Sequence, residues 1–291
     1  MEKKVRLNRV IQLLEQGQVA FAPRIVANGN YEEIMAVAES AFDFVILEME
    51  HQGFDFPTLR HSLQYLLNRR RILEGGTLQP TATPLVRIPP NAREMDQWVV
   101  KQTLDTGAYG LVVPHLATVE EARAVVAAMR YPRPPAAAEK GDGGPGERGW
   151  WPTQAARYWG LAVEEYYRVA DLWPLAPEGE LFLLGIVEDR EGVENLPRML
   201  KEVRGLSAVW AGSGDLSVDM GYGGNTRHPQ VEEAVQQILA TCLEYKVPCC
   251  IIADVSEVEE RVRQGFRLIS APVGRSHEAL ERGRKAAGRS A

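Results

Sequence analysis

Short apolar runs alternate along the chain with longer stretches in which apolar residues recur at helical spacing. The short runs predict eight buried strands, at Val19–Ala22, Phe44–Leu47, Thr83–Val86, Gly110–Val113, Leu181–Ile186, Ala208–Ala211, Pro248–Ile252 and Leu268–Ala271. The longer stretches predict helices between them, at Tyr31–Ser40, Phe56–Leu67, Met95–Thr106, Val119–Met129, Glu191–Leu200, Pro229–Glu244 and Ser256–Gln264. The order is therefore strand, then helix, repeated.

This alternation is typical of βαβ units, which build a parallel sheet covered by helices. Eight such units can close into a (β/α)₈ barrel, the TIM barrel, which commonly takes roughly 250 residues. The chain has 291 residues, so we expect an α/β fold with one barrel domain spanning 1–291. An open doubly wound sheet is the alternative, but no Gly-x-Gly-x-x-Gly follows the first predicted strand, as a dinucleotide site would require.

Two segments depart from the repeat. Residues 132–148 hold four prolines and four glycines, which cannot sustain a helix or strand and predict an inserted surface loop. After the last strand, Ser276–Arg289 forms a polar and basic helical pattern with few apolar residues. We expect that terminal helix to pack on a neighbouring subunit.

Composition narrows the classes of function. The formal net charge of −6 gives no reason to bind nucleic acid or an anionic membrane, since both attract clustered positive charge. The dense basic run Arg69–Arg71 is expected to be a solvated helix end. No stretch approaches the ~20 apolar residues of a membrane span, and the N-terminus lacks the apolar core of a signal peptide, so a cytoplasmic protein is predicted. Cys242, Cys249 and Cys250 are expected to be reduced and buried.

Polar residues follow several of the predicted strands directly. In a parallel barrel the carboxyl ends of the strands converge on one mouth, where the active site forms. The residues found at these positions are Glu48, Glu50 and His51, then Arg87, then Pro114 and His115, then Glu188, and last Gly212, Ser213, Gly214 and Asp215. We therefore expect the chemistry of the protein at this mouth.

Glu188 and Asp215 come from two different strand ends and could hold one hard cation such as Mg²⁺ or Mn²⁺. Water and substrate oxygens would complete its coordination. Each carboxylate could instead cap the helix that follows it. The small residues of Gly212–Asp215 leave backbone N–H groups free to point at an anion such as a carboxylate, although a plain strand-to-helix turn has the same composition.

Arg87 and His51 are the remaining candidates for chemistry. A guanidinium directly after an apolar strand needs an anionic or oxygen partner, so Arg87 could stabilise an enolate oxygen or form a structural ion pair. An imidazole can take up a proton near neutral pH, which makes His51 a candidate general base. A structural histidine is the alternative.

The residues that follow the strands carry a resemblance to a known family. From about Phe42 to about Gly274 the chain resembles the HpcH/HpaI aldolases, which are metal-dependent pyruvate aldolases of the phosphoenolpyruvate/pyruvate barrel superfamily. The most specific match is Gly212–Asn225 followed by His228-Pro229. Other similar segments are Phe42–His51, Leu85–Arg87, Leu104–Gly107, Val112–Pro114, Arg130–Pro132, Glu188–Glu191 and Asn195–Pro197.

The resemblance implies a role for each matching residue. Glu188 and Asp215 would bind the metal, Mg²⁺ or Mn²⁺ with Co²⁺ as a further option, and the metal would chelate a 2-oxo acid. His51 would be the base, with Asp105 as its orienting partner, and Arg87 would contact the 2-oxo oxygen. The backbone at Gly212–Asp215 would receive the carboxylate. Family members form hexamers with exchanged C-terminal helices, which implies a homo-oligomer.

Some positions depart from the family pattern. Glu48 stands where the family has Asp, and with Met49 it is expected to crowd the substrate entrance. Ile186 replaces a typical Gln two positions before the metal Glu. Trp150 and Trp151 follow Arg148-Gly149 where small residues are usual, and we expect them to form an apolar lid over the aldehyde.

These observations predict a metal-dependent carbon–carbon lyase that cleaves a 4-hydroxy-2-oxo acid to pyruvate and an aldehyde, or runs the reverse addition. One alternative is a lyase of the same superfamily that acts on a CoA thioester of the malyl or citryl type. Another is a catalytically silent barrel that binds an oxo acid or scaffolds an oligomer.

Overall fold

The computed structural model describes residues 5–23, 25–133, 145–271 and 276–290. Its strands are β1 (Ala20–Ala22), β2 (Val26–Ala27), β3 (Phe44–Glu48), β4 (Thr83–Arg87), β5 (Gly110–Val113), β6 (Phe182–Val187), β7 (Ala208–Ala211), β8 (Cys249–Ile252) and β9 (Leu268–Ser270). Its helices are α1 (Arg9–Glu15), α2 (Tyr31–Glu39), α3 (Phe56–Leu66), α4 (Arg69–Gly75), α5 (Asn91–Glu94), α6 (Gln97–Asp105), α7 (Val119–Met129), α9 (Thr153–Trp159), α10 (Val163–Val169), α11 (Arg190–Glu202), α12 (Ser213–Asp219), α13 (Pro229–Glu244), α14 (Val258–Gln264) and α15 (Ser276–Ala286).

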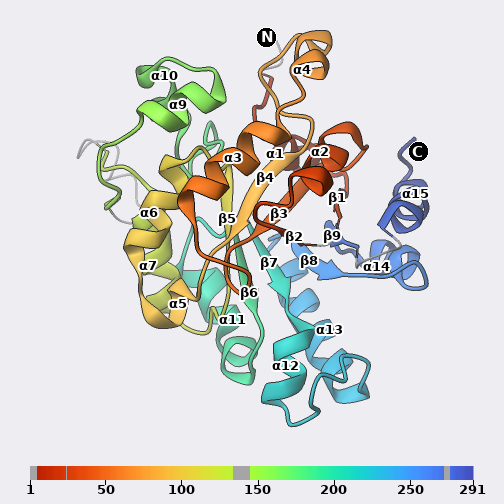
Figure 1. Cartoon of the computed structure of the whole chain (residues 1–291). Helices are drawn as coiled ribbons and strands as arrows, with labels where there is room; N and C mark the ends of the chain where they lie inside the picture. The colour runs from red at the N-terminus through yellow and green to blue at the C-terminus, as the bar shows by residue number, and fades with distance from the viewer. Residues whose placement is uncertain (1–4, 24, 134–144, 272–275, 291) are drawn as a thin grey trace.

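The strands form one sheet in the order β1-β9-β8-β7-β6-β5-β4-β3-β2, and every pairing between neighbours is parallel. The predicted α/β class with a parallel sheet is confirmed, and each of the eight predicted strands overlaps an observed one. The ninth, β2, was not predicted. β1 and β2 follow each other closely in the chain but stand at opposite ends of the strand order, so the sheet curls back toward its own beginning (Figure 1).

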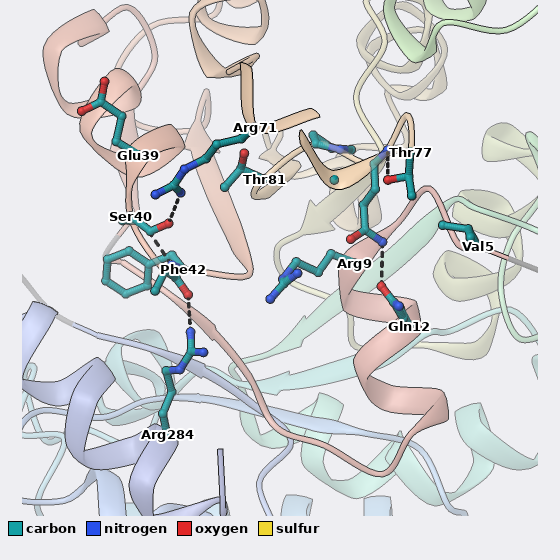
Figure 2. A pocket seen from close by; sticks show the side chains of 14 residues that line it. Val5, Arg9, Gln12, Glu39, Ser40, Phe42, Arg71, Thr77, Thr81 and Arg284 are labelled. Carbon is teal, nitrogen blue, oxygen red and sulfur yellow. Dashed lines mark hydrogen bonds between the residues drawn. The ribbon is translucent and has the colours of Figure 1, made fainter. Parts of the chain in front are cut away.

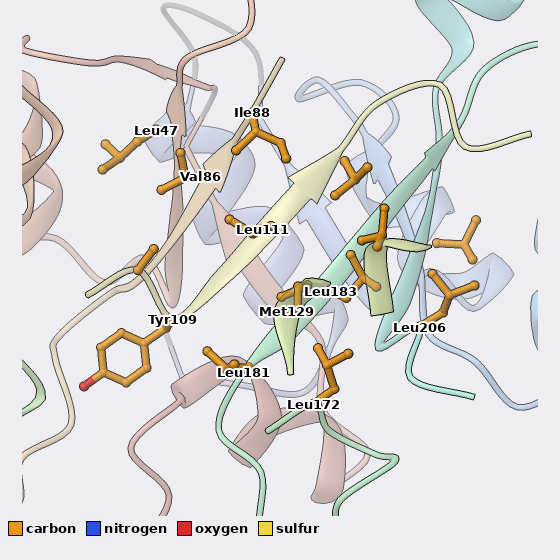
Figure 3. Packing of buried hydrophobic residues seen from close by; sticks show 14 of the residues in the cluster. Leu47, Val86, Ile88, Tyr109, Leu111, Met129, Leu172, Leu181, Leu183 and Leu206 are labelled. Carbon is orange, nitrogen blue, oxygen red and sulfur yellow. The ribbon is translucent and has the colours of Figure 1, made fainter. Parts of the chain in front are cut away.

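The two faces of the strands bury two separate sets of apolar side chains, as the period of two requires. Val45 and Leu47 of β3 belong to a large cluster shared with the surrounding helices. Figure 3 shows Leu47 in this cluster with residues of β4, β5 and β6. Phe44 and Ile46 belong to a second cluster with α1 and the opposite faces of the other strands. Burial on both faces is what makes these strands continuous apolar runs.

Helix α1 covers the amino ends of the strands. The side chain of Asn8 caps α1 by accepting from the backbone N–H of Val10, and its amide donates to the carbonyl oxygen of Glu180, just before β6. The backbone N–H of Arg9 donates to the hydroxyl of Thr83 at the start of β4. The carboxyl ends are therefore the side of the sheet left for a substrate. They face downward in Figure 1, toward α12.

The predictions for the terminal helix and for the insertion can be tested only in part. Helix α15 packs on its own chain, where a Cβ at Gly283 would lie 2.5 Å from Cε1 of Phe21. Packing of this helix on a neighbouring subunit stays a prediction. Most of the predicted insertion, residues 134–144, lies outside the described residues, and its described flanks at 132–133 and 145–148 are neither helix nor strand. Helices α9 and α10, which follow it, were not predicted.

Three other expectations can be compared with the fold. The three cysteines are buried and unpaired, as expected, and burial raises the pKa of the Cys250 thiol. Within the described ranges no helix combines the length and the apolar composition needed to cross a membrane. The basic run at Arg69–Arg71 is exposed and lies at a helix end, as expected. It starts α4, because Asn68 caps that helix by accepting from the backbone N–H of Arg71.

Candidate active site

Four strands bring the predicted site residues to one end of the sheet. The register of β3 and β4 sets Glu48 beside Arg87, and that of β6 and β7 sets Val187 beside Ala211. Glu188 continues directly from β6, and the backbone N–H of Gly212 donates to the carbonyl oxygen of Val187 at 3.0 Å. Glu188 and the Gly212 turn are therefore neighbours because their strands are paired.

Glu48 and Arg87 form a buried ion pair. Nε and Nη2 of Arg87 both donate to Oε2 of Glu48, the former at 2.8 Å. Oε1 of Glu48 accepts from the backbone N–H of Glu50 at 2.6 Å and from that of His51 at 3.2 Å. Glu48 is 2% exposed, so both oxygens are used in shaping the turn after β3. Met49 is fully buried in the cluster beneath the helices. The expectation that its side chain crowds the substrate entrance is therefore wrong.

Glu50 links Arg87 to His51. Its Oε2 lies 3.1 Å from Nε of Arg87 and 3.3 Å from Nε2 of His51. Burial raises the pKa of Glu50, and the charge of Arg87 opposes that rise. The His51 side chain is 62% exposed while that of Glu50 is 4% exposed. The imidazole can therefore exchange protons with solvent or substrate while a buried carboxylate holds one side of its ring.

The carboxyl groups of Glu188 and Asp215 approach closely enough for a hydrogen bond between them. Two carboxyl groups can share such a bond only when one of them carries a proton. Burial, together with the charges of Asp215 and Glu50, raises the pKa of Glu188 to about 8, and a hydrogen bond from the backbone N–H of His115 limits the rise. That N–H lies 2.8 Å from Oε1 of Glu188. At neutral pH the pair thus retains a proton that a cation could replace.

The glycine of the turn is required by close packing against Glu188. A Cβ at Gly212 would lie 2.7 Å from Cβ of Glu188 and 3.0 Å from its Oε2, so any side chain there would displace the carboxylate. Gly212 precedes α12, whose first turn holds Asp215 and receives no side-chain cap. Ser213, Gly214 and Asp215 thus form the first turn of a helix that begins at the same end of the sheet as Glu188.

The donor set of this pair fits a hard divalent cation. Both groups offer carboxylate oxygens, which Mg²⁺ and Mn²⁺ prefer. Glu188 is 5% exposed, and its raised pKa is the expected mark of carboxylates crowded without a counter-charge. Within the described parts of the chain no group of three or more His, Cys, Asp or Glu residues is placed to hold a metal ion. A cation here would keep open positions for water and substrate.

Asp105 lies away from this group within one chain. It ends α6, which returns from the carboxyl end of β4 to the amino end of β5. Its Oδ1 accepts from Nη2 of Arg148 at 2.8 Å, and Arg148 is itself buried under Tyr131 and bonded to the hydroxyl of Tyr166. Burial raises the pKa of Asp105, and the charge of Arg148 opposes the rise. A single chain therefore does not bring Asp105 to His51.

The two tryptophans are also separated from the carboxylate pair. Trp150 is 59% exposed and packs against Tyr131, after α7, and Tyr167 in α10. Trp151 is 67% exposed. Both lie with α9 and α10, on the side of the sheet where α6 and α7 end. Within one chain they do not cover the carboxylate pair.

Two residues that the sequence places at this mouth had no predicted role. Glu50 bridges Arg87 and His51, and His115 donates its backbone N–H to Glu188 with a φ of 54°. Both follow strands directly, so their position in the sequence was a usable signal. The left-handed backbone of His115, which turns that N–H toward Glu188, has no such signal, because non-glycine residues rarely adopt it.

Comparisons with known proteins point to one family. The family model described as HpcH/HpaI aldolase/citrate lyase matches residues 26–274. A 4-hydroxy-2-oxo-heptane-1,7-dioate aldolase from Klebsiella pneumoniae subsp. pneumoniae is 30% identical over 251 residues, which cover 86% of this chain and 81% of that protein. A 5-keto-4-deoxy-D-glucarate aldolase from Citrobacter koseri is 28% identical over 230 residues, covering 79% and 75%. A solved structure of an HpcH/HpaI aldolase/citrate lyase family protein from Burkholderia cenocepacia J2315 matches with a TM-score of 0.74 and 25% identity, covering 95% of this chain and 96% of that one.

Proposed function

Because the chain belongs to the HpcH/HpaI aldolase/citrate lyase family, we propose that it is a divalent-metal-dependent aldolase. It cleaves 4-hydroxy-2-oxo acids to pyruvate and an aldehyde, or joins the two in reverse. The observation that carries this proposal is the close approach of the Glu188 and Asp215 carboxyl groups at the same end of the sheet as Arg87 and His51. Two relatives named as aldolases of this kind, together spanning most of the chain, support it.

The finer features of the fold are part of the same proposal. We count β1 and β2 as one interrupted strand, so that the curled sheet closes as a (β/α)₈ barrel in a single domain. The backbone N–H of Asp43, just before β3, donates to the carbonyl oxygen of Phe21 in β1 at 2.8 Å, which supports closure. Exchange of α15 between subunits would require its contacts with Phe21 to form in a partner instead.

Glu188 and Asp215 would hold the cation, Mg²⁺ or Mn²⁺ with Co²⁺ as a further option, and the cation would supply Lewis-acid stabilisation of negative charge on the oxo acid. Arg87 adds a permanent positive charge beside them. Its Nε and Nη2 are fixed by Glu48, and among the described residues Nη1 has no recorded partner. We assign Nη1 to the 2-oxo oxygen, where charge develops during the reaction.

His51 acts as the base. In cleavage its imidazole removes the proton of the 4-hydroxyl, the bond between C3 and C4 breaks as the aldehyde forms, and the electron pair stays on C3 as the pyruvate enolate. A proton then returns to C3, which completes pyruvate. Glu50 lies 3.3 Å from Nε2 and would stabilise the imidazolium formed in the first step.

The positions of the remaining predicted residues bear on how copies of the chain would assemble. The backbone at Gly212, Ser213, Gly214 and Asp215 would receive the substrate carboxylate. Since one chain does not bring Asp105, Trp150 and Trp151 to this end of the sheet, their proposed roles as orienting partner and aldehyde lid need a second copy of the chain. A homo-oligomer, hexameric by family resemblance, would supply it.

The test is exchange of the methyl protons of pyruvate into deuterated water, followed by NMR. The purified protein with Mg²⁺ or Mn²⁺ should catalyse exchange, chelation should stop it, and aldehydes added with pyruvate should give 4-hydroxy-2-oxo acids. Glu188→Gln should lose the activity, while Glu191→Gln, an exposed change in the first turn of α11, should keep it. Absence of exchange in the metal-loaded protein would point to a silent binder, and activity only with acetyl-CoA and glyoxylate to a thioester lyase.

A further inference from the structure

A cavity of about 630 Å³ lies at the end of the sheet opposite the carboxylate pair. Its walls come from α1, the segment joining α2 to β3, the segment joining α4 to β4, and α15. The residues that matter for its chemistry are Arg9, Glu39, Arg71, Thr81 and Arg284. Figure 2 shows the guanidinium groups of the three arginines directed into the same space from different sides.

Two of these guanidinium groups have no carboxylate partner. Nη1 of Arg71 donates to the carbonyl oxygen of Ser40 at 2.8 Å, and Nη1 of Arg284 donates to that of Ala41 at 2.7 Å. Across the described residues neither arginine lies within 4.0 Å of a carboxylate oxygen. The carbonyl groups after α2 account for one nitrogen of each guanidinium, and Nε of Arg284 donates to the carbonyl oxygen of Ser290 at 2.7 Å, yet a guanidinium carries five donors. Capping of α2 thus explains only part of their placement.

The third guanidinium, that of Arg9, shares its carboxylate partner with Arg289. Nε of Arg9 lies 2.9 Å from Oδ1 of Asp43, but both Nη atoms of Arg289 bind the same carboxylate at 2.7 and 2.8 Å. Burial and the neighbouring charge of Arg289 lower the pKa of Arg284. The cavity wall therefore holds three arginines against the exposed Glu39, within a chain of net charge −6. Positive charge concentrated in a concave site of an acidic protein attracts anions.

A further polar group in the wall is unsatisfied. Oγ1 of Thr81 is buried and has no hydrogen-bond partner, although Thr81 lines the cavity. A buried hydroxyl without a partner is unfavourable, and rotation of the Thr81 side chain about its Cα–Cβ bond would turn the hydroxyl toward a ligand oxygen in the cavity.

This cavity is separate from the proposed catalytic centre. Asp43 and Glu48 stand at opposite ends of β3, and five residues of strand span about 16 Å. A small molecule held between Arg71 and Arg284 cannot reach the Glu188 and Asp215 pair. Its binding therefore does not depend on the proposed aldolase activity.

We propose that this cavity binds a small polyanion, a ligand that carries a phosphate group or several carboxylates. Planar guanidinium groups match the oxygens of both kinds of group and can bind them through two parallel hydrogen bonds. Arg71 and Arg284 supply the unpaired charge, Arg9 adds a third donor, and Thr81 adds a hydroxyl. The same contacts would join α2, α4 and α15 through one ligand.

Calorimetric titration of the metal-loaded protein with inorganic phosphate tests the proposal, with tricarballylate as the carboxylate probe and potassium chloride at matched ionic strength as the blank. Arg71→Gln and Arg284→Gln should each weaken binding about tenfold or more. Arg70→Gln is the matched control, because it removes the same charge from the same helix at a side chain that is 87% exposed and paired with Glu74. That variant should bind as the native protein does.

Two more variants make the result decisive. Thr81→Asp breaks no existing hydrogen bond and sets a carboxylate among the arginines, so it should abolish binding even if the arginine variants fold poorly. Glu188→Gln removes the proposed metal site and should leave binding unchanged. The proposal is overturned if neither probe binds at about 10 mM, if Thr81→Asp binds like the native protein, or if Glu188→Gln alone removes binding. Binding of one probe and not the other identifies the group that the ligand carries.

Discussion

Stability of the metal-free protein should fall as pH rises through neutrality, because of Glu188. Its pKa in the folded chain is about 8 against an ordinary value of 4.5, so the folded state holds this proton more tightly than the unfolded state does. The stabilisation is fully present below about pH 4.5 and is lost progressively up to about pH 8. A shift of roughly 3.5 units at 1.36 kcal/mol per unit gives up to about 5 kcal/mol.

A bound divalent cation should reverse this trend, since it replaces the proton between Glu188 and Asp215. Metal binding competes with protonation and therefore strengthens as pH rises. Urea unfolding followed by circular dichroism, from about pH 5 to about pH 8.5, with chelator or with Mn²⁺, measures both effects. The gap between the two curves should widen toward the alkaline side.

The Glu188→Gln variant isolates this group from the others that titrate. Burial also raises the pKa of Glu50, Asp105 and Glu180, so the native slope contains their contributions too. The variant should show a shallower loss of stability with pH in chelator and little response to Mn²⁺. Glu191→Gln, at an exposed position, should keep the native slope. Equal slopes for the native protein and Glu188→Gln would refute the assigned proton and the cation site built on it.

Further substitutions test the geometry of the site. Gly212→Ala should destabilise the fold by about 2 kcal/mol in urea unfolding and weaken metal affinity, because the added Cβ meets Glu188. Gly214→Ala is the control: a Cβ there meets open space, so its stability should be nearly unchanged. Arg87→Lys keeps the charge but loses the planar donors, and kcat for aldol cleavage should fall about a hundredfold; full activity would remove this residue from the mechanism. Replacing the Trp150–Trp151 pair with alanines should shift kcat/KM among aldehydes, and unchanged selectivity would discard the lid.

The strands and their carboxyl ends could be predicted because burial on both faces leaves a direct mark in the sequence. Phe44–Leu47 is apolar at every position, since alternate residues fill two different clusters. The short strand β2 leaves no comparable mark, because only two of its residues pair with β3. Helix α4 was missed because its helical surface has no buried residue, and periodicity detects a helix only through its buried face.

The sequence shows which residues follow strands and so belong to the site, but it shows less well where a residue outside the strand ends will lie. Placing Glu48, Arg87, Glu188 and Asp215 at one end requires only the direction of the strands. Asp105 ends a helix, and a helix that follows a strand carries its last residue back to the amino end of the sheet. The strand-end rule therefore says nothing about Asp105, whose proposed role came from family resemblance and needs a second chain.

The charges of the site residues determine the order in which metal and substrate can bind. Glu48, Glu50, Glu188 and Asp215 bring four carboxyl groups to one end of the sheet, and Arg87 is paired with the first two. An oxo acid is itself an anion, and it would be repelled by such a site while Glu188 and Asp215 are both ionised. A divalent cation removes that repulsion and supplies the attraction. The oxo acid should therefore bind after the metal, and its affinity should depend on metal concentration even where Arg87 is intact.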